Sequence, residues 1–394
     1  MCGCLVVLAW RCERSGRIGA RFVAGQFPPS VTTPAENAAN RPAQQLQAYK
    51  TTVGDLAVDA DRIVALWRAG LSQSGMPEAK LDWYYRHNPE GTPLVVFLYH
   101  IDTQDTVGVA SVGPRRIRFG GEMLRAGALV DFVTRPEHRT FFPAMFLQRE
   151  VRRRALGEYT ILFGFPNANS LPIVRRVGYQ CVGQMVRRAR VLRTAAYLAK
   201  YLPDWLSRVV GPLIDSLRAT EMAMRVLVNT GFQSQWQERP DAGFDELWQR
   251  MAAPGVVMGV RDMAFLTWRF VDVPSKSFKF FTLVSSADRR LVAYAVCEAN
   301  GAVLQVEDFL IDAEMPSAGT RLWLDLSREA MRMGYASLSV DFLGCDRLQR
   351  QLNAVGLLVR QKRPVFASVA KSSGGASMWP TETSMWYLTS ADDD

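Results

Sequence analysis

Residues 130–150 read VDFVTRPEHRTFFPAMFLQRE. An apolar, strand-like run is followed by a proline, a basic turn and a run with helical spacing, which is the order of an anion-binding strand, loop and helix. Such loops usually contain glycine so that backbone amides can close on a phosphate, but this one contains Phe141, Phe142 and Pro143. Pro143 has no N–H, although proline is tolerated in the first turn of a helix. We expect the loop to keep backbone donors at Arg139, Thr140, Phe141, Phe142 and Ala144.

The composition indicates a globular chain with more than one domain. It has 394 residues, of which 48% are hydrophobic and 22% are charged. The six cysteines form no CxxC pair and the three histidines are scattered, so neither a zinc site nor a disulfide framework is predicted. No apolar run approaches the roughly 20 residues that a transmembrane helix needs. We expect a cytoplasmic protein without a metal or a transmembrane segment.

The net charge of +9 is concentrated in one segment. Residues 149–193 contain ten arginines and only two acidic residues, Glu150 and Glu158. Either a polyanionic partner such as a nucleic acid or a solvated helix face accounts for such a cluster. Because no nucleic-acid motif accompanies the arginines, and because they adjoin the loop, we expect no nucleic-acid partner.

The patterns along the chain divide it into four segments. Residues 1–50 lack periodicity and are rich in small and polar residues, which predicts a disordered leader. Residues 51–190 and 236–394 alternate helical and strand-like runs, which predicts two α/β domains. Residues 191–235 are helical in pattern and form a connector. Either a helix packed between the domains or an amphipathic helix on a membrane surface fits this connector.

The second domain repeats four landmarks of the first in the same order. They are a tryptophan six residues before a proline, an aspartate in an apolar run, a tyrosine before a strand, and a glycine after a helix. The pairs are Trp83 and Trp268, Asp131 and Asp308, Tyr159 and Tyr335, and Gly178 and Gly356. Similar spacings in one order predict two tandem domains of one architecture.

The order of elements in residues 51–190 resembles the GNAT superfamily of acyl-coenzyme A N-acyltransferases. The superfamily motif [QR]xxGx[GA] is matched by RTFFPA, with Arg139 first, Ala144 last and Phe142 in place of the central glycine. The segment FGFPNANSLPIVRRVGY, residues 163–179, is similar to a bacterial branch associated with polysaccharide and envelope biosynthesis. The resemblance implies an α/β (α+β) fold of two tandem GNAT-like domains, each with a mixed, mostly antiparallel central sheet flanked by helices.

The resemblance implies an N-acyltransferase that moves an acyl group, expected to be acetyl, from acyl-coenzyme A to a primary amine. The bacterial branch suggests an amino sugar or sugar nucleotide as the acceptor. The superfamily's frequent tyrosine acid would fall at Val174, and the second domain has no RxxGxG at its corresponding helix. We therefore expect a cofactor-free second domain, and keep a catalytically inactive tandem binding or scaffold module as a second hypothesis.

The resemblance also implies roles for individual residues. Asp131 is a candidate base for the acceptor amine, or else a structural twin of Asp308 that bonds loop amides in both domains. Asn167 is a candidate catalytic residue, or else a helix cap together with Asn169. Trp83 and Trp268 are expected to pack in the core. The expected cofactor-binding residues are Phe132, Val133, Thr134, Arg139, Thr140, Phe141, Phe142, Ala144 and Asn169. The expected acceptor residues are Tyr84, Tyr85 and His87.

Overall fold

The computed structural model describes residues 48–70, 76–198, 202–228, 231–251, 255–370 and 382–393. All of them belong to one unit that begins at Gln44. The expected leader, residues 1–50, lies outside the described residues except for its last three, of which Tyr49 and Lys50 already belong to the first strand.

The first half of the chain alternates helices and strands around a sheet. Its elements are β1 (Tyr49–Val53), α2 (Leu56–Gly70), α3 (Pro77–Lys80), the π-helix η1 (Leu81–Arg86), β2 (Leu94–His100), β3 (Thr106–Phe119), β4 (Glu122–Thr134), the 3₁₀ turn η2 (Pro136–His138), α4 (Phe141–Ala155), β5 (Ile161–Gly164), α5 (Leu171–Val177) and β6 (Gln180–Val191).

Two helices, α6 (Ala195–Leu198) and α7 (Asp204–Val228), lead to the second half. Its elements are β7 (Phe232–Gln237), α8 (Ala242–Arg250), β8 (Val257–Gly259), α9 (Met263–Phe270), β9 (Phe278–Ser285), β10 (Leu291–Asn300), β11 (Val303–Ile311), α10 (Pro316–Arg332), β12 (Ser337–Leu343), α11 (Asp346–Ala354), β13 (Leu358–Val369), η3 (Thr383–Met385), β14 (Trp386–Thr389) and η4 (Ser390–Asp392).

Local sequence signals account for several of these boundaries. Asp241 and Asp262 cap α8 and α9, because each carboxylate accepts a backbone N–H of the first turn. Gly178 and Gly356 follow α5 and α11 with φ values of 99° and 82°, a left-handed conformation that favours glycine. The paired glycines found in the sequence therefore end equivalent helices.

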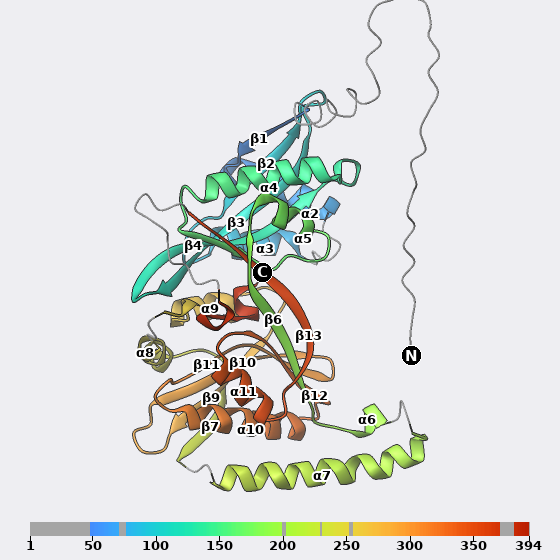
Figure 1. Cartoon of the computed structure of the whole chain (residues 1–394), viewed down its shortest axis with the longest axis vertical. Helices are drawn as coiled ribbons and strands as arrows, with labels where there is room; N and C mark the ends of the chain where they lie inside the picture. Colours follow the sequence, from blue (N-terminus) through green and yellow to red (C-terminus); the bar gives the residue numbers. More distant parts are fainter. Residues whose placement is uncertain are drawn as a thin grey trace, which may run out of the picture. The chain divides into compact units, whose positions relative to one another are not determined.

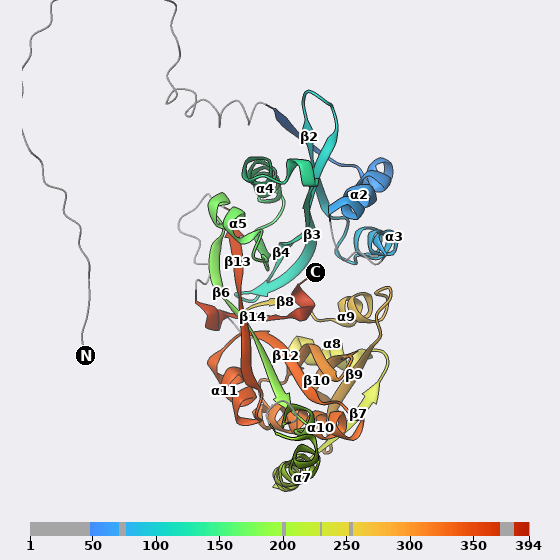
Figure 2. The same ribbon diagram turned by 90° about the vertical axis from the view of Figure 1, so that its right-hand side faces the viewer.

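The two halves share one sheet, in which they exchange their last strands. The hydrogen-bonded order is β1-β2-β3-β4-β5-β13-β6-β12-β11-β10-β9-β7. Strand β13 of the second half lies between β5 and β6, while β6 of the first half pairs with β12. Each strand of the first half has a counterpart in the second half, and the two sets follow the same order when counted from opposite edges of the sheet. The halves therefore have an approximate twofold arrangement. Figures 1 and 2 show β6 and β13 running through both halves.

The predicted fold class is confirmed, because each half has a mixed, mostly antiparallel sheet flanked by helices. The pairs β4–β5 and β11–β12 are parallel, and the neighbours of both pairs on the main path are antiparallel. The division into domains at residues 190 and 236 stays a proposal. Strand pairing crosses that division, because β13 completes the sheet of the first half.

The paired tryptophans meet where the halves join. The rings of Trp83 and Trp268 are stacked with centroids 5.1 Å apart. Each indole N–H donates to the backbone carbonyl of the other tryptophan, over 2.8 and 3.1 Å. This reciprocal contact confirms the expected packing role of both residues and follows from the twofold arrangement.

The connector helix α7 packs on α10 of the second half and on α6. Both views place it at the end of the second half and not between the halves, which is where one of the two interpretations of the connector put it (Figures 1 and 2). Trp205, Val209, Leu213 and Leu217 are more than 60% exposed along one side of α7. Among the described residues, none of the helices combines the length and the apolar character needed to cross a membrane.

Candidate functional site

In the first half, β4 and β5 separate after a short paired stretch, and we call this divergence the first-half cleft. The two strands pair only over Ala126–Ala128 and Ile161–Phe163, after which β4 continues to Thr134. Opposite Ala110 of β3, β4 carries two residues, Asp131 and Phe132, and so forms a β-bulge. Asp131 has a φ of 50°, which is uncommon for a residue other than glycine. Bulges of this kind re-aim a side chain, here the Asp131 carboxylate.

Asp131 lies in a buried polar cluster. Its Oδ1 accepts from Lys80 Nζ over 2.7 Å and its Oδ2 accepts from the Tyr85 hydroxyl over 2.8 Å. The side chain of Asp131 is 2% exposed, whereas that of Lys80 is 27% exposed. The cluster therefore holds a carboxylate in the core beside an ammonium group that reaches water.

The π-helix η1 explains how Tyr85 reaches Asp131. Its wider turn, closed by the bond from His87 N to the Asp82 carbonyl, buries Trp83, Tyr84 and Tyr85 together. Tyr84 and Tyr85 were expected to meet the acceptor, but their rings are buried among aromatic side chains. His87 is exposed, and its Nδ1 lies 2.9 Å from the Asp82 carbonyl. An acceptor-binding role for these three residues stays a prediction.

Helix α4, the helix that follows β4, begins without a side-chain cap. Thr140 is the N-cap residue in extended conformation, and its side chain makes no capping bond. Phe142 is half-buried and packs against the core under α4, whereas the Phe141 ring is 40% exposed, with the Arg176 guanidinium 5.9 Å from its centroid. The Phe142 ring thus belongs to the core, and the amides of the first turn carry no cap from Thr140.

The loop before α4 is anchored by its own side chains. The Arg139 guanidinium donates to the carbonyls of Thr134 and Gly70, over 3.4 and 3.3 Å. Nδ1 of His138 lies 2.9 Å from the Tyr49 hydroxyl, on the first strand. Partial burial, and secondarily His100, lower the pKa of His138. Its neutral form is favoured on folding, so this stabilisation is present above the unfolded pKa of about 6.5 and is lost as the pH falls through the folded pKa.

Asn167 organises the turn that precedes α5. Its Oδ1 accepts from the backbone amides of Asn169 and Ser170, each over 3.0 Å. These bonds stabilise the turn before α5, whose N-cap residue is Ser170 and has no side-chain capping bond, and the Asn167 and Asn169 side chains are both exposed. The catalytic role of Asn167 and the cofactor role of Asn169 stay predictions.

The equivalent gap in the second half is filled by the chain itself. Strand β14 pairs with the end of β12, and η4 follows it. The Tyr387 hydroxyl donates to the Phe309 carbonyl, and the Thr389 hydroxyl donates to Asp308 Oδ1 over 2.6 Å, so β14 reaches β11 as well. The segment 386–392 thereby lies between β11 and β12 in the second half, at the position that corresponds to the separation of β4 and β5 in the first half.

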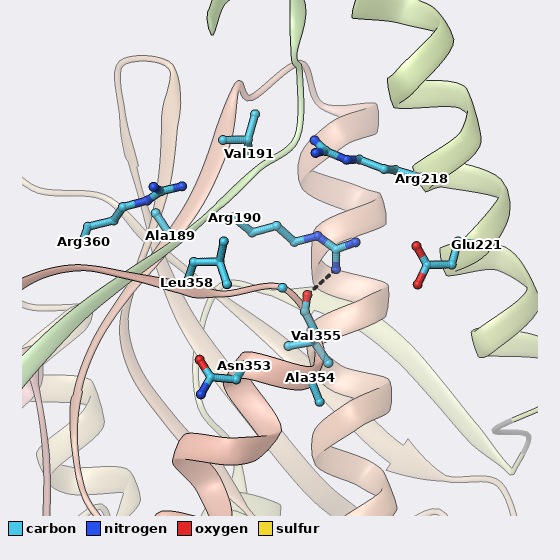
Figure 3. Close-up of a pocket in the computed structure, with 11 residues that line it drawn as sticks. Ala189, Arg190, Val191, Arg218, Glu221, Asn353, Ala354, Val355, Leu358 and Arg360 are labelled. Atoms are coloured by element: carbon cyan, nitrogen blue, oxygen red, sulfur yellow. Dashed lines mark hydrogen bonds between the residues drawn. The ribbon is translucent and has the colours of Figure 1, made fainter.

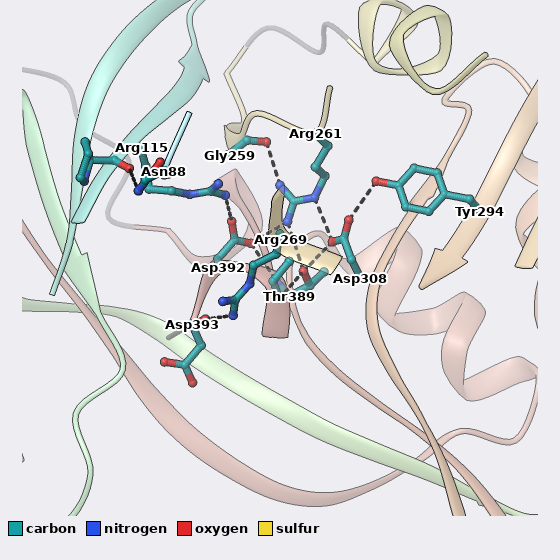
Figure 4. A network of polar contacts seen from close by, with 12 residues as sticks. Asn88, Arg115, Gly259, Arg261, Arg269, Tyr294, Asp308, Thr389, Asp392 and Asp393 are labelled. Carbon is teal, nitrogen blue, oxygen red and sulfur yellow. Dashed lines mark hydrogen bonds and ion pairs between the residues drawn. The ribbon is translucent and has the colours of Figure 1, made fainter. Parts of the chain in front are cut away.

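A buried ionic network holds this segment and joins the halves (Figure 4). Arg261 donates to Asp308 over 3.0 Å and to Asp392 over 2.6 Å, and none of these three side chains is exposed. Arg115 of β3 donates to the other oxygen of Asp392 over 3.0 Å. Burial opposes ionisation of Asp392, but Arg261 and Arg115 hold its pKa below the ordinary value.

A cavity of about 310 Å³ lies where the exchanged strands run together. It is lined by Met185, Arg187, Asp341, Gln361 and Arg363. The Arg363 guanidinium lies 5.2 Å from the ring centroid of Phe165, which directly follows β5. The cavity, which we call the junction pocket, therefore has one lining residue in contact with the residue that follows β5.

No protein-family model and no curated protein matches this sequence. Among solved structures, a GCN5-related N-acetyltransferase from Anabaena variabilis superposes with a TM-score of 0.57 at 13% identity, over 82% of this chain and 73% of that chain. One from Kribbella flavida gives 0.51 at 15% identity, over 82% and 72%. N-myristoyltransferase of Saccharomyces cerevisiae with bound myristoyl-CoA gives 0.53 at 10% identity, over 86% and 89%.

This chain has the GNAT fold. The resemblance seen in the sequence is thereby confirmed at the level of the fold. The superpositions cover 82–86% of this chain and 72–89% of those three chains, so the likeness of fold extends over both halves.

Sequence reasoning missed several residues of these sites. Lys80, the last residue of α3, belongs to no sequence motif, and its bond to Asp131 is a tertiary contact. The junction pocket depends on the pairing of Arg187 with both Asp341 and Gln361 across exchanged strands, which no local pattern signals. The position of the closing residues 386–392 against the end of β12 is likewise a tertiary feature. Among the described residues, no group of three His, Cys, Asp or Glu side chains could hold a metal ion.

Proposed function

We propose that this protein is an N-acyltransferase that binds acyl-coenzyme A in its first half and transfers the acyl group to a primary amine. The observation that carries this proposal is the difference between the two clefts. Residues 386–392 fill the second cleft, whereas among the described residues the strands β4 and β5 diverge beside the uncapped start of α4. A GNAT fold with one such open cleft suits one acyl donor per chain.

The residues at the first cleft fit the phosphates of coenzyme A. The amides of Phe141, Phe142 and Ala144 belong to the first turn of a 15-residue helix, where backbone donors and the helix dipole favour an anion. The half-buried Phe142 ring packs against the core cluster below α4, and in this proposal it leaves the phosphate position open. Arg139 shapes the loop through two carbonyls, so we assign it a positioning role. Phe132, Val133 and Thr134 would present the β4 backbone to the rest of the donor.

The proposed reaction needs a neutral amine, because only the unprotonated nitrogen can attack the thioester that acyl-coenzyme A supplies. Asp131 is our candidate proton acceptor, held in place by Tyr85 and Lys80. Lys80 would hold the carboxylate ionised before the proton arrives. At the position of the superfamily's usual tyrosine acid stands Val174, whose side chain has no proton to supply. This side chain is 3% exposed and packs in the core with α4.

We assign the junction pocket to the acceptor. Arg187 and Arg363 offer guanidinium donors to an acidic group, and Asp341 and Gln361 offer oxygen acceptors to hydroxyls. Arg363 is also paired with Asp393, which fixes its orientation. This combination suits an amino sugar or sugar nucleotide, and the proposal includes a cytoplasmic reaction in polysaccharide biosynthesis.

Substitution of Thr140 tests where the donor binds. Thr140 is an N-cap residue without a capping bond, so Thr140→Asp and Thr140→Asn should both cap α4 and leave stability equal or higher by up to about 1 kcal/mol. Only the aspartate adds a negative charge at the phosphate position. We expect Thr140→Asp to raise the Kd for acetyl-coenzyme A at least about tenfold relative to Thr140→Asn, since one lost charged contact costs about 1.5 kcal/mol or more.

Titration calorimetry gives the Kd, and urea unfolding gives the stability. Equal affinity of the aspartate and asparagine variants would show that the donor does not bind at α4. No binding of acetyl-coenzyme A to the unsubstituted chain at high micromolar concentration would overturn the enzyme proposal and favour a binding or scaffold module.

A further inference from the structure

A second cavity, of about 330 Å³, lies between α7 and the outer ends of β6 and β13 (Figure 3). It is lined by Ala189, Arg190, Val191, Arg218, Glu221, Asn353, Ala354, Val355, Gly356, Leu358 and Arg360. We call it the α7 pocket. None of its lining residues belongs to the first-half cleft or to the junction pocket. Its volume is at the lower end of the range for small-molecule sites, about 300–1,000 Å³.

The α7 pocket is strongly cationic. Arg190 of β6, Arg218 of α7 and Arg360 of β13 bring three guanidinium groups to one cavity, and Glu221 of α7 is the one carboxylate in its lining. The lining therefore carries a net charge of about +2, because arginine is always ionised in proteins. A phosphate monoester carries about −1.5 to −2 at neutral pH, which matches this charge.

Two of the guanidinium groups are held in place by the protein. Arg190 Nη1 donates to the Val355 carbonyl over 2.7 Å. Arg218 Nη1 donates to the Thr194 hydroxyl over 3.1 Å, and Thr194 is itself fixed because its backbone amide donates to Asp215 over 3.0 Å. Guanidinium groups oriented in this way lose little freedom when an anion binds.

The internal repeat supplies a comparison for this pocket. Counting from the paired glycines, Arg190 lies twelve residues after Gly178, and Ser368 lies twelve residues after Gly356. In the same way, Arg360 corresponds to Val182. The first half thus forms the same strand pair without cations at these positions, so the fold does not require the arginines. Within the described part of the chain, helix α7 has no counterpart in the repeat, and it supplies the third arginine.

We propose that the α7 pocket binds the phosphate group of a small ligand, at a site separate from the acyl-transfer cleft. Arg190, Arg218 and Arg360 bind the phosphate oxygens, and Asn353 lines the same pocket. The Asn353 Oδ1 accepts from Arg188, so the group that Asn353 has left to offer a ligand is its NH₂ donor. The Glu221 carboxylate selects ligands that carry a hydroxyl or amino group next to the phosphate.

Inorganic phosphate is the probe for this site in the full chain. Binding is followed by ³¹P NMR at constant ionic strength, for the unsubstituted chain, Arg360→Gln and the double variant Arg218→Gln/Arg360→Gln. We expect saturable binding that weakens about tenfold or more in the double variant, because two charge-assisted contacts are lost. Arg332→Gln is the matched control: Arg332 is exposed on α10 and paired with Glu329, and we expect no change.

Glu221→Gln tests for tighter phosphate binding, a change that a folding defect would not produce. Removal of the carboxylate raises the net charge of the pocket, so we expect phosphate to bind several-fold more tightly. Absence of saturable binding, or equal loss in Arg332→Gln and the double variant, would overturn the proposal. The affinity for acetyl-coenzyme A, measured on the same variants, should stay unchanged, which separates this site from the acyl-donor site.

Discussion

Asp131 and Asp308 are the residues at which the two halves can be compared most directly. Each lies at the bulge of its strand and accepts a hydrogen bond from a tyrosine hydroxyl, Tyr85 in one half and Tyr294 in the other. Their cations differ, because Lys80 is 27% exposed whereas Arg261 is fully buried. The shared contacts support a structural role for both aspartates, and the partly exposed lysine leaves room for chemistry only at Asp131.

Asparagine at each position separates structure from catalysis. Asp308→Asn leaves Arg261 buried with one carboxylate fewer and should cost about 3 kcal/mol of stability. Asp131→Asn should cost only about 1–2 kcal/mol, because Lys80 can turn to water. Urea unfolding measures both. We expect Asp131→Asn to lose acyl transfer about 100-fold or more, as for a lost general base, and Asp308→Asn to keep it per folded molecule.

The activity measurement follows coenzyme A release with an amine acceptor. The same substitution in the second half is the control, because it changes one carboxylate to an amide without touching the first cleft. Full activity of Asp131→Asn would show that Asp131, like Asp308, has a structural role only.

At the scale of elements, helix α4 shows how a glycine-poor loop fits the GNAT fold. The central glycine of the superfamily motif is replaced by Phe142, whose ring packs against the core cluster below the helix. Pro143 follows in the first turn, where its missing N–H costs little. The loop therefore lacks the backbone freedom of a glycine but gains a ring that packs against the core. Its path is fixed by Arg139 and His138.

Phe142→Gly tests whether the ring blocks the donor. Loss of a half-buried ring should cost about 2 kcal/mol, and glycine within the helix should cost about 1 kcal/mol more. We expect no gain in affinity for acetyl-coenzyme A by calorimetry. Phe141→Gly is the control. Because the Phe141 ring is 40% exposed, the loss of stability in this variant should come mainly from placing glycine in the helix. Tighter binding in Phe142→Gly alone would show that the ring obstructs the site.

At the scale of the whole molecule, the exchanged strands make the halves interdependent. Strand β13 lies between β5 and β6, so neither of these strands has its full set of partners within residues 48–191. The Trp83–Trp268 contact and the network of Arg115, Arg261 and Asp392 add buried contacts across the same junction. Unpaired strands and uncompensated buried charges are both costly.

A fragment of residues 48–191 should therefore fail to fold cooperatively when it is expressed alone. The same fragment with residues 358–370 fused through a glycine-serine linker regains β13, and we expect it to recover dispersed NMR signals and a thermal transition. Independent folding of the shorter fragment would contradict the structural importance of the exchange.

The sequence by itself determined the repeat and the architecture. Helical and alternating periodicities predicted the elements, and the four landmark pairs predicted two halves of one design, because a repeated spacing reflects a repeated supersecondary unit. The strand, loop and helix at residues 130–150 predicted the position of α4, and Gly178 and Gly356 marked two helix ends because only local backbone conformation is involved.

Only the tertiary structure decided which strands pair, what fills the second cleft and where Lys80, Arg187 and Arg363 lie. Pairing partners far apart in the chain are selected by the free energy of the whole sheet, to which every strand contributes, and not by the local propensity of a segment. For the same reason, no local pattern predicts the environment of the Phe142 ring, which the packing of α4 brings against the core cluster below the helix.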